Sequence, residues 1–137
     1  MTETGHPLIT FRLSSTSGVS AYLQIAKQVR QALQLGLLQP GDQLPTVKEV
    51  VSTIAINPNT VLKAYQLLEH QGLVEGRQGQ GTFVKASLPG PSPTRQAHLR
   101  RGIEKWVRSA FEAGLDAEGA TALFEGVLQE LEMEQIA

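Results

Sequence analysis

The sequence contains no cysteine, so disulfide bonds and thiolate metal sites are excluded. Its histidines, His6, His70 and His98, are scattered and lack the spacing of metal ligands. No Ser/His/Asp order and no phosphate-binding loop occurs, so we expect no catalytic residue, no metal and no cofactor. A small enzyme is therefore a disfavoured interpretation, which only a strongly perturbed titratable pair in a cleft would revive.

Long hydrophobic runs are also missing. No apolar segment approaches the roughly 18 residues of a membrane-spanning helix. Residues 1–7 lack the basic start and apolar core of a signal peptide. With the absence of cysteine, this predicts a soluble, cytoplasmic protein that does not bind membranes.

The charge of the chain is nearly balanced but unevenly distributed. Its net value is −1, yet residues 1–88 carry seven basic and five acidic side chains, whereas residues 89–137 carry five basic and eight acidic ones. This asymmetry is typical of a DNA-binding half joined to a half that stays off DNA.

A linker is predicted at residues 87–94. Three prolines and one glycine fall within residues 87–93, a composition that interrupts helices and central strands. We interpret this stretch as a semi-stiff connection between two domains, residues 1–86 and residues 95–137.

The first domain shows three stretches with helical signals. Apolar residues recur at helical spacing over residues 20–35, with Ser20 as the expected cap. A capping box at residues 46–49 begins a second helix. Asn57, followed by a proline, predicts a third helix that ends near His70.

Two short β-prone runs, residues 73–75 and 82–84, follow the third helix. The segment between them, residues 77–81, contains glycines that let a backbone approach a ligand closely. The pattern predicts a hairpin, or wing. The expected fold is therefore mainly α with a small β-hairpin (α+β), a winged helix-turn-helix followed by a C-terminal two-helix dimerisation hairpin.

The outer face of the third helix and the wing are polar. Asn side chains can pair with adenine edges, Thr can contact a thymine methyl or a phosphate, and Lys suits phosphate. An ordinary solvated helix face and a plain tight turn are the alternative interpretations of this surface. The candidate DNA-binding residues are Thr46, Lys48, Asn57, Asn59, Thr60, Lys63, Arg77, Gln78, Gly79, Gln80, Gly81 and Thr82.

Two amphipathic helices are predicted beyond the linker, separated by Gly114, with Asp116 capping the second. Alone they bury too little surface for a stable domain, so we expect a four-helix bundle with a second copy of the chain. The basic side chains of the first helix are expected to be solvated or to pair with glutamates of the second. The candidate dimerisation residues are Leu99, Ile103, Trp106, Phe111, Leu123, Phe124, Val127 and Leu131. A cavity among the four helices, walled by Trp106, Phe111 and Phe124, could hold an effector of unknown identity.

These motifs together resemble the N-terminal domain of the GntR family of bacterial transcriptional regulators. The resemblance covers residues 22–84, and the short two-helix tail is similar to that of the YtrA-like subgroup. It implies a DNA-binding regulator, a repressor, that controls a neighbouring transporter operon. The motifs that carry it include Pro40-Gly41-Asp42-Gln43-Leu44-Pro45, Asn57-Pro58-Asn59-Thr60-Val61 and Gly79-Gln80-Gly81-Thr82-Phe83-Val84.

Two positions depart from the broader family. Many members have arginine where this chain has Lys48 and Pro58. Lysine keeps the charge but lacks the bidentate fork of arginine. The expected readout therefore shifts to Asn59, Thr60 and the wing. We expect a homodimer in which each subunit inserts its third helix into one of two successive major grooves of an inverted-repeat operator. A winged protein-docking module without a specific DNA target is the alternative.

Overall fold

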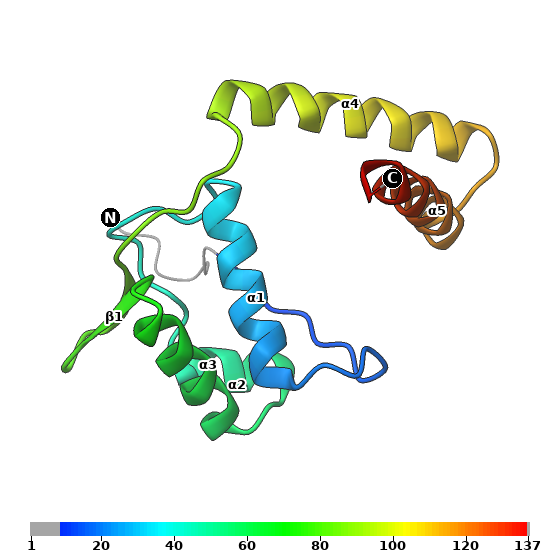
Figure 1. Ribbon diagram of the computed structural model, residues 1–137. Coiled ribbons are helices and arrows are strands. Elements are labelled where there is room, and N and C mark those ends of the chain that lie inside the picture. The colour runs from blue at the N-terminus through cyan, green and yellow to red at the C-terminus, as the bar shows by residue number, and fades with distance from the viewer. Residues whose placement is uncertain (1–8, 137) are drawn as a thin grey trace, which may run out of the picture. The chain divides into compact units, whose positions relative to one another are not determined.

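The computed structural model describes residues 9–136 (Figure 1). The chain divides into two compact units, Met1–Pro91 and Ser92–Ala137. The expectations that concern residues 1–7, including His6, lie outside the described residues.

Within residues 9–91, three helices are followed by a two-stranded antiparallel hairpin. Helix α1 spans Ala21–Gln34, α2 spans Val47–Ile54 and α3 spans Pro58–His70. Strands β1 and β2 span Val74–Arg77 and Gly81–Val84. Figure 1 shows the hairpin extending away from the helices. The predicted winged helix-turn-helix, mainly helical with one small hairpin, is confirmed.

The core of this unit lies between α1, α3 and the base of the hairpin. The inward faces predicted from helical spacing are buried, and each large aliphatic side chain there contributes roughly 1.5–3 kcal/mol. Phe11, which precedes α1 and has no periodic signal, is also buried at 4 % exposure. The most deeply buried large side chains are Ile25, Val29, Leu33, Leu38, Leu44, Val61, Leu68, Val74 and Val84.

Two of the three predicted N-caps in this unit are formed. Thr46 makes the reciprocal capping box with Glu49, and Asn57 accepts the backbone N–H of Asn59. Ser20 occupies the cap position of α1, but its side chain makes no cap hydrogen bond, so that expectation was wrong. The loop before α1 is held instead by Gln24, whose side-chain amide donates to the carbonyl of Val19 at 2.8 Å.

A segment before α2 extends the hairpin on the far side of β2. The backbone N–H of Leu44 donates to the carbonyl of Thr82 at 2.9 Å, and that of Val84 donates to Asp42 at 2.7 Å. Gln43 also forms an isolated antiparallel bridge with Phe83. Strand β2 is therefore flanked on both sides, which fixes the base of the wing to the loop that leads into α2.

The second unit consists of α4, Pro93–Glu112, and α5, Ala117–Ile136. Helix α4 begins inside the stretch expected to be linker, because Ser92 caps it and a proline is tolerated at the first helical position. Gly114 has φ = +99° and follows the end of α4, and Asp116 accepts the N–H of Gly119 at 2.8 Å. Both features agree with the sequence-based expectation.

Helices α4 and α5 share little buried surface. Within residues 92–136, only Ala110 and Ala120 are buried, and they lie on either side of the turn. Figure 1 shows the two helices crossing rather than running alongside each other. Arg100 and Arg108 pair with Glu104 of their own helix, not with glutamates of α5 as one alternative expected. No described helix is both long enough and apolar enough to cross a membrane.

Candidate nucleic-acid interface

The turn between α2 and α3 places the start of α3 at the surface. Ala55 has left-handed backbone angles, φ = 49° and ψ = 54°, which reverse the chain direction within a few residues. Asn57 Oδ1 accepts the N–H of Asn59 at 2.8 Å. The cap uses this oxygen as an acceptor, so Asn57 positions the first turn of α3 while its side-chain NH2 stays available to donate.

The outer face of α3 carries the expected polar side chains. Asn59, Lys63 and Gln66 are exposed, whereas Thr60 is half-buried at the flank of the helix. The Lys63 ammonium lies 4.1 Å from the centroid of the Tyr22 ring on α1. The ring attracts the cation, so Lys63 is held toward the α1 side of the face.

The start of α2 offers a second polar point. Thr46 Oγ1 accepts the N–H of Glu49 at 3.1 Å, and the Thr46 N–H donates to Glu49 Oε1 at 2.8 Å. The cap uses the hydroxyl oxygen as an acceptor, so its hydrogen stays available to donate to a phosphate. Lys48 is exposed on the same turn.

A buried hydrogen bond joins α3 to the loop before α2. The Tyr65 hydroxyl donates to the carbonyl of Pro45 at 2.7 Å. Burial, and secondarily the negative charge of Glu49, raise the pKa of this hydroxyl far above its usual value. The bond fixes the orientation of α3 relative to the start of α2, and the sequence gives no local sign of it.

The turn at the tip of the wing has fewer residues than expected. Arg77 and Gly81 form the last pair of the two strands, so residues 78–80 alone make the turn. The Gln80 N–H donates to the Arg77 carbonyl at 2.9 Å, and Gly79 has φ = +76°, as the third position of a type II turn requires. Gln78, Gly79 and Gln80 are exposed. The other two candidates, Gly81 and Thr82, are half-buried in β2.

Gln43 supports the wing, a role that was not expected. Its side-chain amide donates to the carbonyl of Gln80 at 3.0 Å. A Cβ at position 81 would lie only 2.6 Å from Gln43 Nε2, and Gly81 has φ = +123°. The backbone angle therefore favours glycine at this position, and a larger residue would also displace the Gln43 side chain. The signal was present in the Gly-Asp-Gln-Leu-Pro motif, but only the fold shows that this motif lies against the wing.

Arg77 is paired within the wing and is not a free cation. Its Nη2 lies 3.0 Å from Glu75 Oε2, and its Nε donates to the same oxygen at 3.1 Å. Its guanidinium lies 4.2 Å from the centroid of the Phe83 ring. The sequence-based prediction names Arg77 as a candidate DNA contact but neither of its partners, Glu75 and Phe83.

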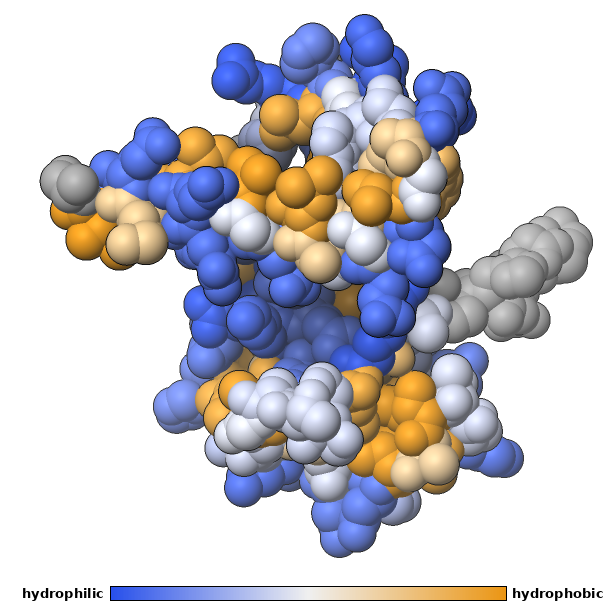
Figure 2. Space-filling model, turned by 90° about the vertical axis from the view of Figure 1, so that its right-hand side faces the viewer, coloured by the Kyte–Doolittle hydropathy of each residue, from blue (hydrophilic) through white to orange (hydrophobic). Residues whose placement is uncertain are grey.

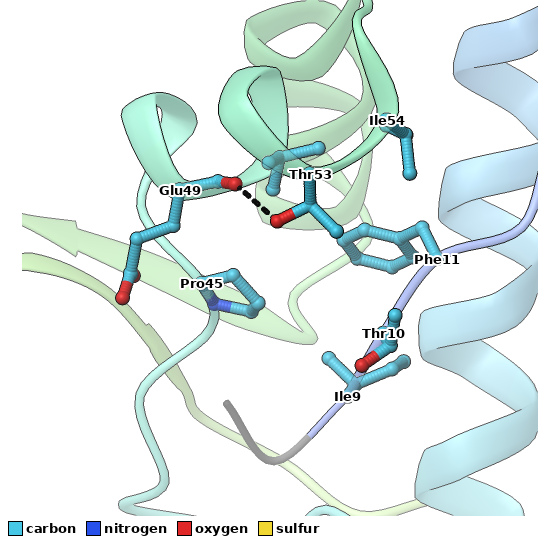
Figure 3. A pocket seen from close by; sticks show the side chains of 8 residues that line it. Ile9, Thr10, Phe11, Pro45, Glu49, Thr53 and Ile54 are labelled. Carbon is cyan, nitrogen blue, oxygen red and sulfur yellow. Dashed lines mark hydrogen bonds between the residues drawn. The ribbon is translucent and has the colours of Figure 1, made fainter. Parts of the chain in front are cut away.

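A small pocket lies beside α2. It lies between the segment before α1 and the outer side of α2, where Thr53 Oγ1 donates to the Glu49 carbonyl at 2.7 Å (Figure 3). Its volume of about 30 Å³ suits one or two water molecules rather than an effector. Among residues 9–136, no three side chains with metal-binding groups lie close enough together to hold a metal ion.

The arrangement defines a class of protein. A capped α3 with an exposed polar face, preceded by a tight turn and followed by a glycine-tipped hairpin, is a winged helix-turn-helix of the DNA-binding kind. Residues 21–84 match the family described as "Bacterial regulatory proteins, gntR family".

Two relatives from Bacillus subtilis strain 168 match over most of their length. The chain is 40% identical over 108 residues to the HTH-type transcriptional repressor YtrA, covering 78% of this chain and 83% of that protein. It is 38% identical over 97 residues to the HTH-type transcriptional regulator YhcF, covering 71% and 80%. The chain belongs to the GntR family of bacterial transcriptional regulators.

Solved structures agree with this assignment. The chain resembles YtrA from Sulfolobus acidocaldarius, a GntR-family transcription factor, with a TM-score of 0.53 and 29% identity over 73% of this chain and 99% of that one. It also resembles a Listeria monocytogenes EGD-e protein described as a transcriptional antiterminator, with a TM-score of 0.55 and 29% identity over 89% and 92%. The resemblance inferred from sequence is confirmed.

Proposed function

We propose that this regulator binds an operator sequence in DNA as a homodimer and represses transcription from it. The observation that carries the proposal is the exposed polar face of α3 beside the wing, on a helix that Asn57 and Tyr65 hold in place. Repression is further supported by the similarity to YtrA of Bacillus subtilis, which is named a repressor.

The proposed contacts follow from the chemistry of each side chain. Asn59 is exposed on the first turn of α3 and reads a base edge, while Thr60 at the flank contacts a thymine methyl or a phosphate. Lys63 contacts phosphate. Thr46 and Lys48 contact phosphate from α2, and the wing tip, residues 78–80, lies along the adjacent minor groove with Arg77 behind it.

The homodimer is proposed from the exposed apolar face of the second unit. Figure 2 shows hydrophobic residues as a band over this unit. Because α4 and α5 bury only two alanines, a second copy would supply the missing core as a four-helix bundle. Trp106 is half-buried. The other candidate dimerisation residues are 44–56% exposed: Leu99, Ile103, Phe111, Leu123, Phe124, Val127 and Leu131.

A two-fold dimer implies the form of the operator. Identical subunits related by two-fold symmetry read an inverted repeat, with half-sites about one helical turn apart. A DNA target places the site of action in the cytoplasm. Control of a transporter operon is proposed from the similarity to the YtrA-like subgroup alone.

An effector site among the four helices is also proposed. A groove of about 380 Å³ in the second unit has Trp106 and Phe124 in its wall, together with Ile103. Phe111, which was expected to share this wall, does not line the groove. A small apolar ligand would suit this lining.

Selection of bound sequences from random duplex DNA tests the proposed function. We expect enrichment of one inverted repeat, and Asn59→Ala protein should enrich a repeat that is degenerate at one or two positions per half-site. A library that stays random after repeated rounds, with correctly folded protein, would instead favour the alternative of a winged protein-docking module.

A further inference from the structure

The wing holds its only cation in a small cluster of three side chains. Glu75 and Arg77 are alternate residues of β1, so their side chains lie on the same face of the hairpin. Phe83 is the cross-strand partner of Glu75 on that face. Opposite Arg77 stands Gly81, which has no side chain, so the guanidinium lies diagonally over the Phe83 ring at 4.2 Å.

We propose that Glu75 tunes DNA affinity by holding Arg77 in the free protein and competing for it with DNA phosphates. The inference rests on the proposed DNA-binding function. In the proposed mechanism Glu75 does not contact DNA. It acts through Arg77, whose Nε and Nη2 both contact Glu75 Oε2.

The pair is weak enough to be exchanged on binding. Both side chains are about two-fifths exposed, at 42% and 40%, and ion pairs exposed to solvent stabilise little. Phe83 keeps the guanidinium at the wing during the exchange, because the contact with the ring does not depend on the carboxylate. Arg77 then contacts a phosphate without leaving the surface of β1.

The pairing of Glu75 with Arg77 also determines the net charge of the wing, and so its long-range attraction for DNA. Glu75 and Arg77 are the only charged residues in residues 74–84, so the wing carries no net charge. The nearby Glu69 on α3, whose carboxylate accepts the N–H of Gly76 at 3.5 Å, adds a negative charge, and the exposed Lys85 directly after β2 balances it. The wing therefore does not attract DNA in general, and Arg77 adds affinity only where a phosphate comes close enough to replace Glu75.

Glu75→Gln is the test, because glutamine keeps the shape and an accepting oxygen but removes the charge. Binding is measured on a mixed-sequence duplex of about 20 base pairs, roughly two helical turns, over a series of salt concentrations. We expect affinity to rise by up to about five-fold per wing, the equivalent of the roughly 1 kcal/mol limit for an exposed pair. When Arg77 of the wild-type protein moves to a phosphate, the freed Glu75 carboxylate takes up a cation from solution, which reduces the net release of ions. Glutamine takes up no cation, so the salt dependence should steepen by up to about one ion per wing.

Two variants separate this mechanism from a general charge effect. In an Arg77→Gln background, Glu75→Gln should give no more than the small gain expected from removing one nearby acid, because the cation that Glu75 holds is gone. Glu69→Gln is the matched control, since it removes an acid beside the same wing but leaves Arg77 paired. It should give a smaller gain than Glu75→Gln. Circular dichroism and thermal melting confirm that each variant is folded.

Three results would overturn the inference. They are a gain that persists undiminished without Arg77, an equal gain from Glu69→Gln, and unchanged or weaker binding by Glu75→Gln. In each of these the wild-type protein still binds duplex DNA, so the proposed function stands. Wild-type protein that binds no duplex even at low salt overturns the proposed function and this inference together.

Discussion

The side-chain amide of Gln43 donates a hydrogen bond to the carbonyl of Gln80 at 3.0 Å, which joins the loop before α2 to the tip of the wing. Gln43 precedes α2, and Gln80 lies at the tip of the hairpin. The bond joins the start of the helix-turn-helix to its wing. The same loop also contacts α3, because the Pro45 carbonyl accepts a hydrogen bond from the Tyr65 hydroxyl. The loop before α2 therefore holds both α3 and the wing.

Gly81→Ala should weaken the wing. The new Cβ would lie 2.6 Å from Gln43 Nε2, so Gln43 must move and give up its bond to Gln80. Backbone strain at φ = +123° adds about 1–3 kcal/mol. Urea unfolding at fixed protein concentration should show a lower free energy of unfolding. Gly79→Ala, which has φ = +76° and nothing within 4 Å of the new Cβ, should cost less. An equal cost at both positions would contradict a role for Gln43.

Ala55→Gly should stabilise the first unit by about 1 kcal/mol. Ala55 has φ = 49°, a left-handed conformation that costs a residue with a Cβ roughly 1–2 kcal/mol. Glycine removes this strain but loses more entropy on folding, so the net gain is smaller. Ala64→Gly inside α3 serves as the control and should destabilise by more than about 1 kcal/mol, because it loses a buried methyl group as well as helix propensity. A lower melting temperature for Ala55→Gly would contradict the strained turn.

Stability should fall as pH rises above about 10, the ordinary pKa of tyrosine. The pKa of Tyr65 is raised in the folded state, so above that pH the unfolded chain loses a proton that the folded chain retains. The stabilisation is therefore complete below pH about 10 and declines at higher pH. Melting temperatures measured across this range report the decline.

Tyr65→Phe should remove this alkaline contribution. It should also cost about 1–3 kcal/mol at neutral pH, because the Pro45 carbonyl loses its buried donor. Tyr22→Phe, at the other tyrosine, should leave the alkaline decline in place. An identical decline in Tyr65→Phe would mean that other groups cause it.

Asn59 and Lys63 of α3 should have separable effects on DNA binding. Lys63→Ala should weaken operator and random DNA alike and reduce the salt slope by about 0.9 per subunit. Asn59→Ala should instead cost about 1–3 kcal/mol at the base pair it reads and relax discrimination there. Fluorescence anisotropy with matched and mismatched duplexes distinguishes the two. Unchanged isotherms for both variants would remove α3 from the interface.

Dimerisation should depend on α5. Leu123→Glu and Val127→Glu each place a charge on a side chain that is nearly half exposed in the single chain, at 48% and 44%. If the second copy covers these positions, the buried charge should yield monomers in sedimentation experiments. Thr121→Glu on the same helix is the control for a general effect of added charge. A double variant that stays dimeric would place the interface elsewhere.

Local signals made much of the fold predictable. The caps at Thr46 and Asn57 and the glycine stop after α4 depend on residues only a few positions apart, so a short stretch of sequence contains the whole interaction. The helical spacing of apolar residues likewise predicted the buried face of α1. The predicted linker was too long at its C-terminal end, because a proline such as Pro93 can begin a helix as well as interrupt one.

Contacts between distant segments were not predictable in the same way. Phe11 is buried and Gln43 supports the wing only because the chain returns to these places after many residues. The bond of Tyr65 to Pro45 has the same origin. The pairing of Arg77 with Glu75 is different, because alternate residues of a strand share a face and the pattern was visible in the sequence.

The most direct test of the account is a nuclear magnetic resonance titration of isotope-labelled protein with an operator duplex recovered by selection. We predict that backbone amide shifts concentrate at residues 59–66 of α3 and residues 78–80 of the wing, with α5 unaffected. Shifts confined to α4 and α5, with α3 and the wing unchanged, would contradict the assignment of this surface to DNA.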